Sequence, residues 1–300
     1  MKILVTGGAG FIGSHIVESY LDIGHDVTVV DDLSTGKLEN LDTQRCTFIK
    51  ADISKRDHVN GILERYGPFD VINHQAAQMS VSDSVKDPYN DIRVNIIGTL
   101  NLLEVFGPSC KKFIFASSGG TVYGEHHTPR AEGDPLEPVS PYGISKLTSE
   151  KYIKMYSARF GFEYTILRYS NVYGPRQNPH GEAGVVAIFL NKILNREVST
   201  INGDGVYLRD YIEVNDVVSA NLASITTGVT GIHNVSTGVT LDVNQIWNAI
   251  VSSDPLSGYA PEVKNGPHRE GDIRYSCCIP GEIPGWRPKI SFEEGIKGTV

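Results

Sequence analysis

The sequence predicts an α/β protein with a doubly wound parallel sheet and a smaller, interleaved C-terminal region. Two patterns predict this fold class. In the first half of the chain, short apolar runs rich in β-branched residues alternate with helical stretches, as buried parallel strands and their crossover helices do. After about residue 170 this alternation loosens, beginning with the loop "NVYGPRQNPHG". No linker separates the two parts, so we expect residues 1–170 and residues 171–300 to interleave.

Six apolar runs are predicted as strands, and helical patterns lie between and after them. Each run is short and apolar along most of its length, which is typical of a strand that is buried on both faces. The expected strands are residues 2–6, 26–30, 46–50, 70–74, 112–117 and 163–169. The expected helices are residues 11–23, 88–106 and 142–160 in the first part, and residues 183–195, 215–226 and 242–252 in the second.

The composition argues against several classes of partner. The 300 residues carry a formal net charge of −8 and no basic run, so nucleic acid and anionic membrane surfaces are poor partners. No stretch approaches the roughly 18 apolar residues of a membrane span, and the apolar run in "MKILVTGGAG" is too short for a signal peptide. The four cysteines form no C-x-x-C pair, and we expect reduced thiols in a cytoplasmic protein.

A glycine motif after the first predicted strand indicates a dinucleotide site. Gly7, Gly10 and Gly13 begin the first helix, where glycines let a pyrophosphate approach the backbone and the helix N-terminus favours an anion. Asp31 ends the second strand, where a carboxylate accepts hydrogen bonds from a ribose diol and repels a 2′-phosphate. We therefore predict a Rossmann domain that binds NAD rather than NADP; the alternative is a glycine-rich turn with a capping aspartate. Asp52 is placed either to contact the adenine or to cap the following helix, and both interpretations stay open.

A tyrosine and a lysine one helical turn apart suggest proton transfer. Tyr142 and Lys146 in "PYGISK" share one face of a predicted helix, and an ammonium group beside a phenol favours the phenolate. Such a phenol can exchange a proton with a sugar or alcohol hydroxyl. Upstream, "FIFASSGGTVYG" ends a strand in Ser117 and Ser118, whose position predicts a hydroxyl in the ligand crevice. Taken singly, each feature has a plainer interpretation, namely an amphipathic helix and a serine-glycine turn.

Further motifs occur in a fixed order along nearly the whole chain. They read "TGGAGFIGSH", "HQAAQMSV", "VNIIGTLNLLE", "SSGGTVYGE", "PYGISK", "LRYSNVYGPRQ", "GDGVYLRDYIEVNDV" and "REGDIRYS". With these motifs the chain resembles the extended short-chain dehydrogenase/reductase family. The resemblance implies an NAD-binding Rossmann domain at residues 1–170 and a mainly substrate-binding region at residues 171–300. It also implies epimerisation at carbon 4 of a UDP-hexose, such as UDP-galactose, through a 4-keto intermediate.

The resemblance also implies roles for single residues around the cofactor. Tyr142 matches the catalytic base, and Lys146 matches the lysine that binds the nicotinamide ribose and tunes that base. The other expected NAD contacts are Gly7, Gly10, Phe11, Ile12, Gly13, Asp31, Leu33, Ser34, Thr35, Gly36, Lys37, Asp52, Ile53, Gln75, Ala76, Ala77, Asn95 and Tyr169. The serine motif is one residue longer than the familiar version, which leaves Ser117 and Ser118 as candidates for the catalytic serine. We choose Ser118 because it adjoins Gly119.

On the substrate side, the resemblance implies a diphosphate clamp and a sugar pocket. The expected substrate contacts are Ser118, Thr121, Asn171, Arg209, Arg269, Asp272 and Ser276. Bidentate arginines suit a diphosphate on an otherwise acidic protein. Ser276 matches the position that limits the space beside carbon 2 of the sugar, and its small size implies that N-acetylated hexoses are also accepted.

Other functions remain as alternatives. Gly119 and Gly120 occupy the place where dehydratases of the family carry an Asp-Glu pair, which argues against dehydration. Decarboxylation or 4-epimerisation of UDP-glucuronate is less easily excluded, and the non-enzymatic alternative is an NAD-binding sensor or scaffold. His126 and His127 have no carboxylate or cysteine at metal-ligand spacing, so we expect no metal and a solvated loop near the substrate mouth.

The predicted helices at residues 88–106 and 142–160 carry apolar residues on more than one face. Relatives pair these helices across a two-fold axis, so the resemblance implies a homodimer.

Overall fold

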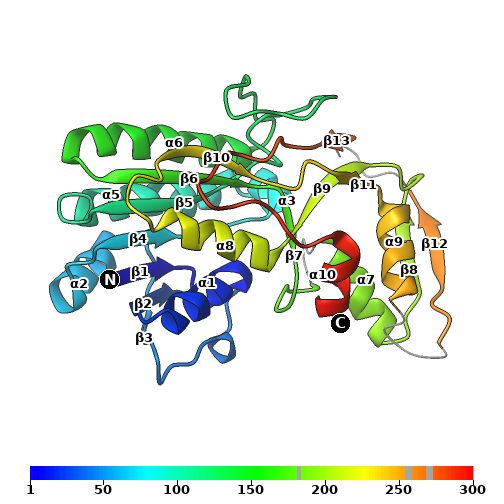
Figure 1. Ribbon diagram of the computed structural model, residues 1–300, viewed down its shortest axis with the longest axis horizontal. Helices are drawn as coiled ribbons and strands as arrows, with labels where there is room; N and C mark the ends of the chain where they lie inside the picture. Colours follow the sequence, from blue (N-terminus) through cyan, green and yellow to red (C-terminus); the bar gives the residue numbers. More distant parts are fainter. Residues whose placement is uncertain (181–183, 254–258, 268–272, 300) are drawn as a thin grey trace.

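The computed structural model describes residues 1–180, 184–253, 259–267 and 273–299. A sheet of seven parallel strands lies at its centre, in the order β10-β6-β5-β4-β1-β2-β3 (Figure 1). The strands are β1 (Lys2–Thr6), β2 (Asp26–Asp31), β3 (Thr47–Lys50), β4 (Val71–His74), β5 (Lys112–Ser118), β6 (Glu163–Tyr169) and β10 (Gly231–Val235). The six strands predicted from apolar runs are thereby confirmed, and so is the doubly wound fold class.

Helices cover both faces of this sheet. On one face lie α1 (Phe11–Asp22) and α8 (Val214–Ser224), which pack against each other. On the other face lie α2 (Arg56–Tyr66), α5 (Gly98–Phe106) and α6 (Pro141–Phe160). Figure 1 shows α6 above the strands and α1 and α8 below them. Ile3 and Val5 point into the core beneath α1, whereas Leu4 points into the core beneath α5 and α6. This two-sided burial explains why the strand sequence is continuously apolar.

The predicted helix at 88–106 is divided by a segment of π-helix. Asp87 caps its N-terminus by accepting a hydrogen bond from the Asn90 N–H (3.0 Å), and Pro88 occupies the first turn. The helix then runs as α4 (Pro88–Asp91), the π-helix η2 (Ile92–Ile97) and α5. Within η2, the Asn95 carbonyl accepts hydrogen bonds from the Thr99 hydroxyl (2.6 Å) and the Ser149 hydroxyl (3.1 Å). The sequence pattern did not predict this π-helix, a feature that is frequent at functional sites.

Helix α6 begins and ends at clear sequence signals. The Ser140 hydroxyl accepts a hydrogen bond from the Gly143 N–H (3.1 Å), and Pro141 occupies the first turn. At the other end, Gly161 adopts a left-handed conformation with φ of 83°. The cap fixes where the first turn of α6 starts, and Tyr142 lies in that turn.

The remaining elements form the smaller region and its connections. Its strands are β7 (Asn171–Tyr173), β9 (Leu208–Glu213), β11 (Thr240–Leu241) and β13 (Tyr275–Ser276), which form one sheet, and β8 (Ser199–Asn202) and β12 (Val263–Gly266), which form another. Its helices are α7 (Val185–Leu194), α9 (Val243–Ser252) and α10 (Phe292–Thr299), which share a separate apolar core with these strands. Two short elements, the 3-10 helix η1 (Leu38–Asn40) and α3 (Val81–Lys86), belong to the first region. Although α8 and β10 come late in the chain, they join the first sheet and its helix layer.

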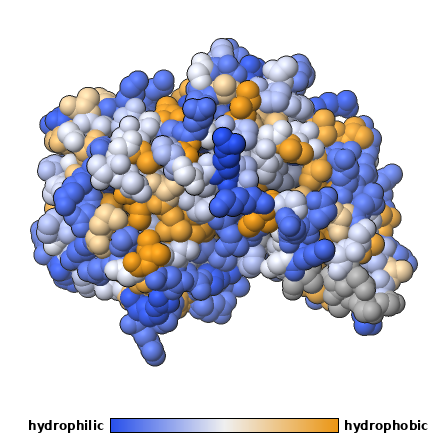
Figure 2. Space-filling model, viewed as in Figure 1, coloured by the Kyte–Doolittle hydropathy of each residue, from blue (hydrophilic) through white to orange (hydrophobic). Residues whose placement is uncertain are grey.

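The surface is that of a polar protein. Hydrophilic residues cover most of the face shown in Figure 2, and apolar residues occur there in scattered groups. Within the described ranges, no helix is both long enough and apolar enough to cross a membrane.

Candidate functional site

The glycine motif lies at the carboxyl edge of the central sheet, between β1 and β4. Gly7 has φ of +68°, and a Cβ there would lie 2.5 Å from the Ala76 nitrogen. A Cβ on Gly13 would lie 2.1 Å from the Gly7 carbonyl oxygen. Gly10 caps α1 without any side-chain hydrogen bond, which leaves the first N–H groups of the helix available to an anion. The cradle therefore fits the pyrophosphate of a dinucleotide.

Asp31 lies at the end of β2, beside this cradle. Its carboxylate accepts hydrogen bonds from the Ala9 N–H (3.0 Å) and the Leu33 N–H (2.8 Å). Burial raises the pKa of Asp31, and the two N–H groups oppose that shift. A Cβ on Gly36 would lie 2.9 Å from both carboxylate oxygens, so a larger residue at position 36 would displace the Asp31 carboxylate or the loop of residues 33–37. A carboxylate held in this position suits a ribose diol.

Asp52 does not cap α2, because the N-cap residue of that helix is Lys55 and no side chain caps it. One of its oxygens accepts hydrogen bonds from the Ser54 N–H (2.9 Å) and the Ser54 hydroxyl (2.7 Å), which holds the turn before α2. The other oxygen pairs with the Arg93 guanidinium at 3.0 Å. Ile53 is buried beneath Gly98 of α5.

The residues that follow β4 are held in place by Asn95. Its side-chain oxygen accepts a hydrogen bond from the Gln78 N–H, and its side-chain nitrogen donates to the Gln78 carbonyl, both at 2.9 Å. The Gln75 side chain donates to the Tyr169 hydroxyl (3.2 Å), and Tyr169 is buried beside it. The structure thus places Gln75, Ala76, Asn95 and Tyr169 along the same edge as the glycine cradle.

Ser118, Tyr142 and Lys146 come together where β5 ends and α6 begins. The Ser118 hydroxyl lies close enough to the Tyr142 phenol to lower the pKa of that phenol. The Lys146 ammonium lies 5.7 Å from the centroid of the Tyr142 ring and donates a hydrogen bond to the Ala116 carbonyl at 2.9 Å. A hydroxyl, a phenol and an ammonium group in this order can pass a proton to or from a bound hydroxyl.

The electrostatics of this group differ from the expectation in one respect. The pKa of Tyr142 is raised, first by burial and then by the nearby charge of Asp91, while the hydrogen bond from Ser118 opposes the shift. Burial also lowers the pKa of Lys146 to about 8, against the opposing influence of Asp91 and Glu150. The sequence pattern considered only the attraction between phenolate and ammonium; desolvation dominates because Lys146 is buried and Tyr142 is half-buried.

The two serines have different partners. The Ser117 hydroxyl donates to the Glu150 carboxylate at 2.6 Å and is buried, so it is turned away from Tyr142. A Cβ on Gly120 would lie 3.9 Å from the Ser118 hydroxyl and equally far from the Ser276 hydroxyl. This geometry supports the choice of Ser118 over Ser117, and it places the Ser276 hydroxyl near the Ser118 hydroxyl, beside Gly120.

The expected substrate residues come from neighbouring strands of the smaller sheet. Ser276 of β13 lies opposite Arg209 of β9, and Asn171 of β7 lies opposite Tyr211 two residues further along β9. The Thr121 hydroxyl is buried and finds no hydrogen-bond partner among the residues that the structure describes, which suits a polar ligand group. Arg269 and Asp272 lie outside the described residues.

The expectation of a fully solvated histidine loop is wrong for His126. This side chain is only 3% exposed, and its ring packs edge-on against Tyr275 with 5.6 Å between centroids. His127 is exposed as expected. The contact with Tyr275 bridges segments far apart in the sequence, so no local pattern indicated it.

Sequence reasoning missed three charged residues behind the site. Asp91, Glu150 and Arg168 are all buried, and Glu150 lies one helical turn beyond Lys146. The one available signal was the continued four-residue spacing from Tyr142 through Lys146 to Glu150.

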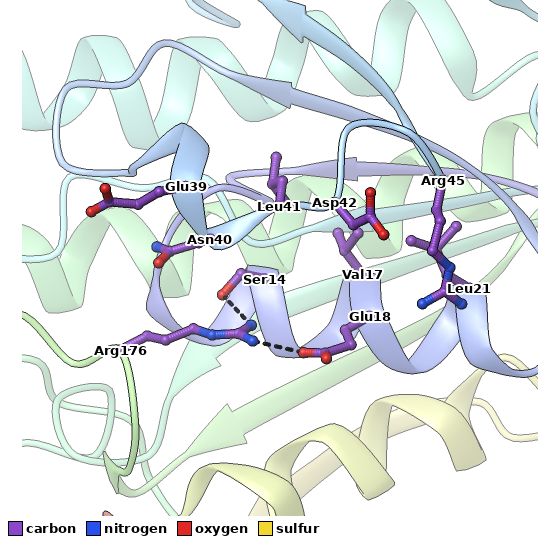
Figure 3. A pocket seen from close by; sticks show the side chains of 10 residues that line it. All are labelled: Ser14, Val17, Glu18, Leu21, Glu39, Asn40, Leu41, Asp42, Arg45 and Arg176. Atoms are coloured by element: carbon purple, nitrogen blue, oxygen red, sulfur yellow. Dashed lines mark hydrogen bonds and ion pairs between the residues drawn. The ribbon is translucent and has the colours of Figure 1, made fainter.

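A separate pocket of about 300 Å³ lies between α1 and residues 39–45 (Figure 3). It is lined by Ser14, Val17, Glu18, Leu21, Glu39, Asn40, Leu41, Asp42, Arg45 and Arg176. Arg176, from the loop after β7, donates to the Ser14 hydroxyl (3.3 Å) and pairs with Glu18 (2.8 Å). The two interactions tie the smaller region to the helix that begins at the glycine cradle. None of the predicted site residues lines this pocket.

Comparison with known proteins gives matches over the whole chain. The model of the NAD dependent epimerase/dehydratase family matches residues 3–236. A UDP-glucose 4-epimerase from Mycolicibacterium smegmatis is 42% identical, over 100% of this chain and 97% of the relative. The structure of UDP-glucose 4-epimerase from Thermotoga maritima with UDP-glucose is 44% identical with a TM-score of 0.93, and covers 100% of this chain and 97% of that one. A Thermus thermophilus UDP-glucose 4-epimerase in complex with NAD has the same TM-score and coverage at 43% identity.

Proposed function

This chain belongs to the NAD-dependent epimerase/dehydratase family, and we propose that it is an NAD-dependent epimerase that interconverts UDP-galactose and UDP-glucose at carbon 4. The observation that carries this proposal is the contact between Ser118 and Tyr142, with Lys146 beside them. It lies at the same sheet edge as a glycine cradle that fits a dinucleotide. The relatives with NAD and with UDP-glucose support both ligands.

The residues of this chain would hold NAD along that edge. The cradle from Gly7 to Gly13 and the first turn of α1 bind its pyrophosphate, and Asp31 binds the adenosine ribose. When bound, NAD supplies the hydride acceptor for carbon 4 of the sugar. We assign most of this binding to residues 1–170 and most substrate binding to residues 171–300, although α8 and β10 belong to the first sheet.

Tyr142 is the proposed proton carrier. It takes the proton from the 4-hydroxyl as carbon 4 is oxidised, and Ser118 hydrogen-bonds the same sugar oxygen. Lys146 lies close enough to stabilise the phenolate that forms. The resulting 4-ketosugar turns about its phosphate linkage and presents its other face, and Tyr142 returns the proton when carbon 4 is reduced again. Arg209 and Asn171 hold the nucleotide diphosphate during this rotation, because the sugar itself must move.

The direct experiment is to incubate the purified protein with UDP-galactose, with no reductant or cofactor added, and to measure UDP-glucose. We expect conversion by the wild type. Tyr142→Phe should lose on the order of 10²-fold or more in turnover while it still binds NAD, because only the proton acceptor is removed. Turnover of Tyr142→Phe within a few-fold of the wild type would contradict the role of Tyr142.

Exposed apolar side chains support a second proposal, a homodimer. Five large apolar side chains on neighbouring helices are each between 41% and 83% exposed: Tyr89, Ile92 and Ile97 on α4 and η2, and Ile144 and Met155 on α6. Pairing of these helices with those of a second copy would bury them. Light scattering at micromolar concentration should give the mass of a dimer, and Ile97→Glu should shift it toward the monomer; a wild-type monomer would contradict the proposal.

The state of the cysteines supports a cytoplasmic location. Cys46, Cys110, Cys277 and Cys278 are all free and buried, as thiols in a reducing compartment are. Cell fractionation tests this, and recovery of the protein outside the cytoplasmic fraction would contradict it.

A further inference from the structure

A buried ion pair lies directly behind the proposed catalytic group. The Arg168 guanidinium donates two hydrogen bonds to the Glu150 carboxylate, at 2.9 Å and 2.7 Å, and the two side chains are 1% and 2% exposed. The Ser117 hydroxyl donates a third hydrogen bond to this carboxylate at 2.6 Å. Glu150 therefore accepts three hydrogen bonds, two from one cation and one from a hydroxyl.

The same arginine extends the network toward the substrate side. Its third contact is the Tyr123 hydroxyl at 2.9 Å, which in turn donates to the Asn234 side-chain oxygen at 2.8 Å. The Asn234 amide donates to the carbonyls of Arg130 (2.9 Å) and Ile279 (3.1 Å). One network thus joins α6, β5, β6, the loop after the serine motif and the segment that follows β13.

Each member of the pair is adjacent to a residue of the proposed site. Glu150 lies one turn beyond Lys146 on α6, and Ser117, bonded to Glu150, precedes Ser118 on β5. In the strand register Ser117 lies opposite Arg168. We propose that Arg168 and Glu150 are positioning residues, which fix the end of β5 so that Ser118 faces Tyr142 and which set the charge around Lys146. This inference rests on the proposed function, because it takes Tyr142 as the group that moves the proton.

A contribution to folding stability does not by itself explain why the protein has a buried ion pair at this position. Removing two charges from water costs several kcal/mol for each ion, and apolar side chains of similar volume often replace buried pairs without loss of stability. What an apolar pair cannot do is bind the Ser117 hydroxyl and the Tyr123 hydroxyl at fixed angles. It also cannot place opposite charges at set distances from Lys146.

The charged groups around Lys146 determine in which direction each substitution should shift its pKa. Tyr142 and Glu150 face it from its own helix, Asp91 from α4, and His74 from β4; Arg168 of β6 faces Glu150. His74 carries no charge near neutral pH, because burial lowers its pKa to about 3. Glu150→Gln would leave the Arg168 cation uncompensated and lower the pKa of Lys146. Arg168→Met would leave the Glu150 carboxylate uncompensated and raise it.

The chain offers a matched control on the same two strands. Lys112 and Glu163 lie opposite each other at the other end of β5 and β6, with 3.5 Å between the ammonium and carboxylate groups. Lys112 is buried, with its ammonium bonded to the Thr226 and Val229 carbonyls. Glu163→Gln removes a charge from a pair on the same strands, at the end away from Ser118; the Glu163 side chain is 37% exposed, so this variant controls for the loss of a charge rather than for burial.

The test is an NMR titration of isotopically labelled lysine, combined with kcat at each pH and thermal unfolding. We expect Glu150→Gln to lower the pKa of Lys146 and Arg168→Met to raise it, with kcat falling about 10-fold or more in each and KM changing less. Glu163→Gln should leave both quantities unchanged. Arg168→Lys keeps the charge but not the bidentate geometry, so it should keep the pKa of Lys146 near the wild-type value and still lower kcat. If Arg168→Met does not fold, Arg168→Lys tests the positioning role in its place.

The proposal would be overturned if Glu150→Gln and Arg168→Met shifted the pKa of Lys146 in the same direction. It would also be overturned if that pKa stayed unchanged and kcat fell only in proportion to the loss of thermal stability. The titration reads Lys146 without any turnover. A wild type that binds NAD but does not epimerise therefore contradicts the proposed function, while the pKa shifts still test the positioning role.

Discussion

The Ser118 hydroxyl lies close enough to the Tyr142 phenol to lower its pKa, whereas the hydroxyl of the preceding residue, Ser117, donates a hydrogen bond to Glu150 at 2.6 Å. Successive residues of a strand point to opposite faces of the sheet. Ser117 therefore points toward Glu150, whereas Ser118, the last residue of β5, points toward Tyr142. This one contact distinguishes between two adjacent serines that the sequence motif leaves equivalent.

Ser118→Ala should therefore lower kcat more than Ser117→Ala, by at least about 10-fold, because only Ser118 touches the proton carrier. Ser117→Ala should act mainly through the Glu150 contact and lose some stability. Steady-state kinetics with UDP-galactose measure both variants. Equal losses, or a larger loss for Ser117→Ala, would mean that the serine is misassigned.

Asp31 should control the choice between NAD and NADP. Its carboxylate lies at the end of β2 with both oxygens turned toward the cradle and the 33–37 loop. Asp31→Ala should weaken NAD binding and reduce the discrimination against NADP, because the ribose acceptor and the repulsion of a 2′-phosphate disappear together. Titration of the apoprotein with each dinucleotide measures this. A wild-type preference for NADP would refute the assignment.

Lys146 should cost the protein stability at neutral pH. Its pKa in the folded protein is lowered to about 8, while in the unfolded chain it keeps the ordinary value of 10.5. Between these two pH values the unfolded state binds more protons, so stability rises with pH through this window. Lys146→Met, which has no charge to bury, should be more stable than the wild type at pH 7 by on the order of 1–3 kcal/mol.

This gain should shrink as the pH is raised from about 8 to about 10.5. Urea unfolding at both ends of the window measures it. Lys151→Met is the control, because Lys151 is exposed on the same helix and should show no such dependence. A gain for Lys146→Met that is constant with pH would contradict the burial of its charge.

Ser276 should determine whether N-acetylated sugars are accepted. It lies beside Gly120, near Ser118, and its side chain is small. We expect turnover of UDP-N-acetylgalactosamine as well as UDP-galactose, and Ser276→Tyr should suppress the first reaction while it spares the second. If the wild type converts UDP-galactose but leaves UDP-N-acetylgalactosamine untouched at millimolar concentration, another side chain, such as Tyr275, closes this volume.

The central sheet could be predicted from the sequence because its strands are buried on both faces. Residues such as Ile3, Leu4 and Val5 are apolar in succession, and that pattern is visible without any tertiary information. The glycine cradle could also be predicted, since the close contacts at Gly7 and Gly13 exclude every other residue. In the smaller region the predicted helices at 183–195 and 242–252 agree with α7 and α9. Its strands were not predicted, because β7 and β13 have three and two residues, too few to show a period.

The polar network behind the site was hidden for a different reason. Arg168 and Glu150 are charged residues, and a charged residue in a sequence is more often at the surface than in a core. Their burial depends on pairing between β6 and α6, and the burial of His126 depends on Tyr275. No local pattern carries such long-range contacts.

The fate of the hydrogen on carbon 4 tests the central claim most directly. The enzyme is supplied with UDP-galactose that carries deuterium at carbon 4, in ordinary water, and the UDP-glucose formed is analysed by mass spectrometry and NMR. Because the hydride leaves carbon 4 and returns to it within one active site while Tyr142 exchanges only the hydroxyl proton, we predict that the deuterium stays on carbon 4. Replacement of that deuterium by hydrogen from water would show that carbon 4 loses a proton instead, and would contradict the account.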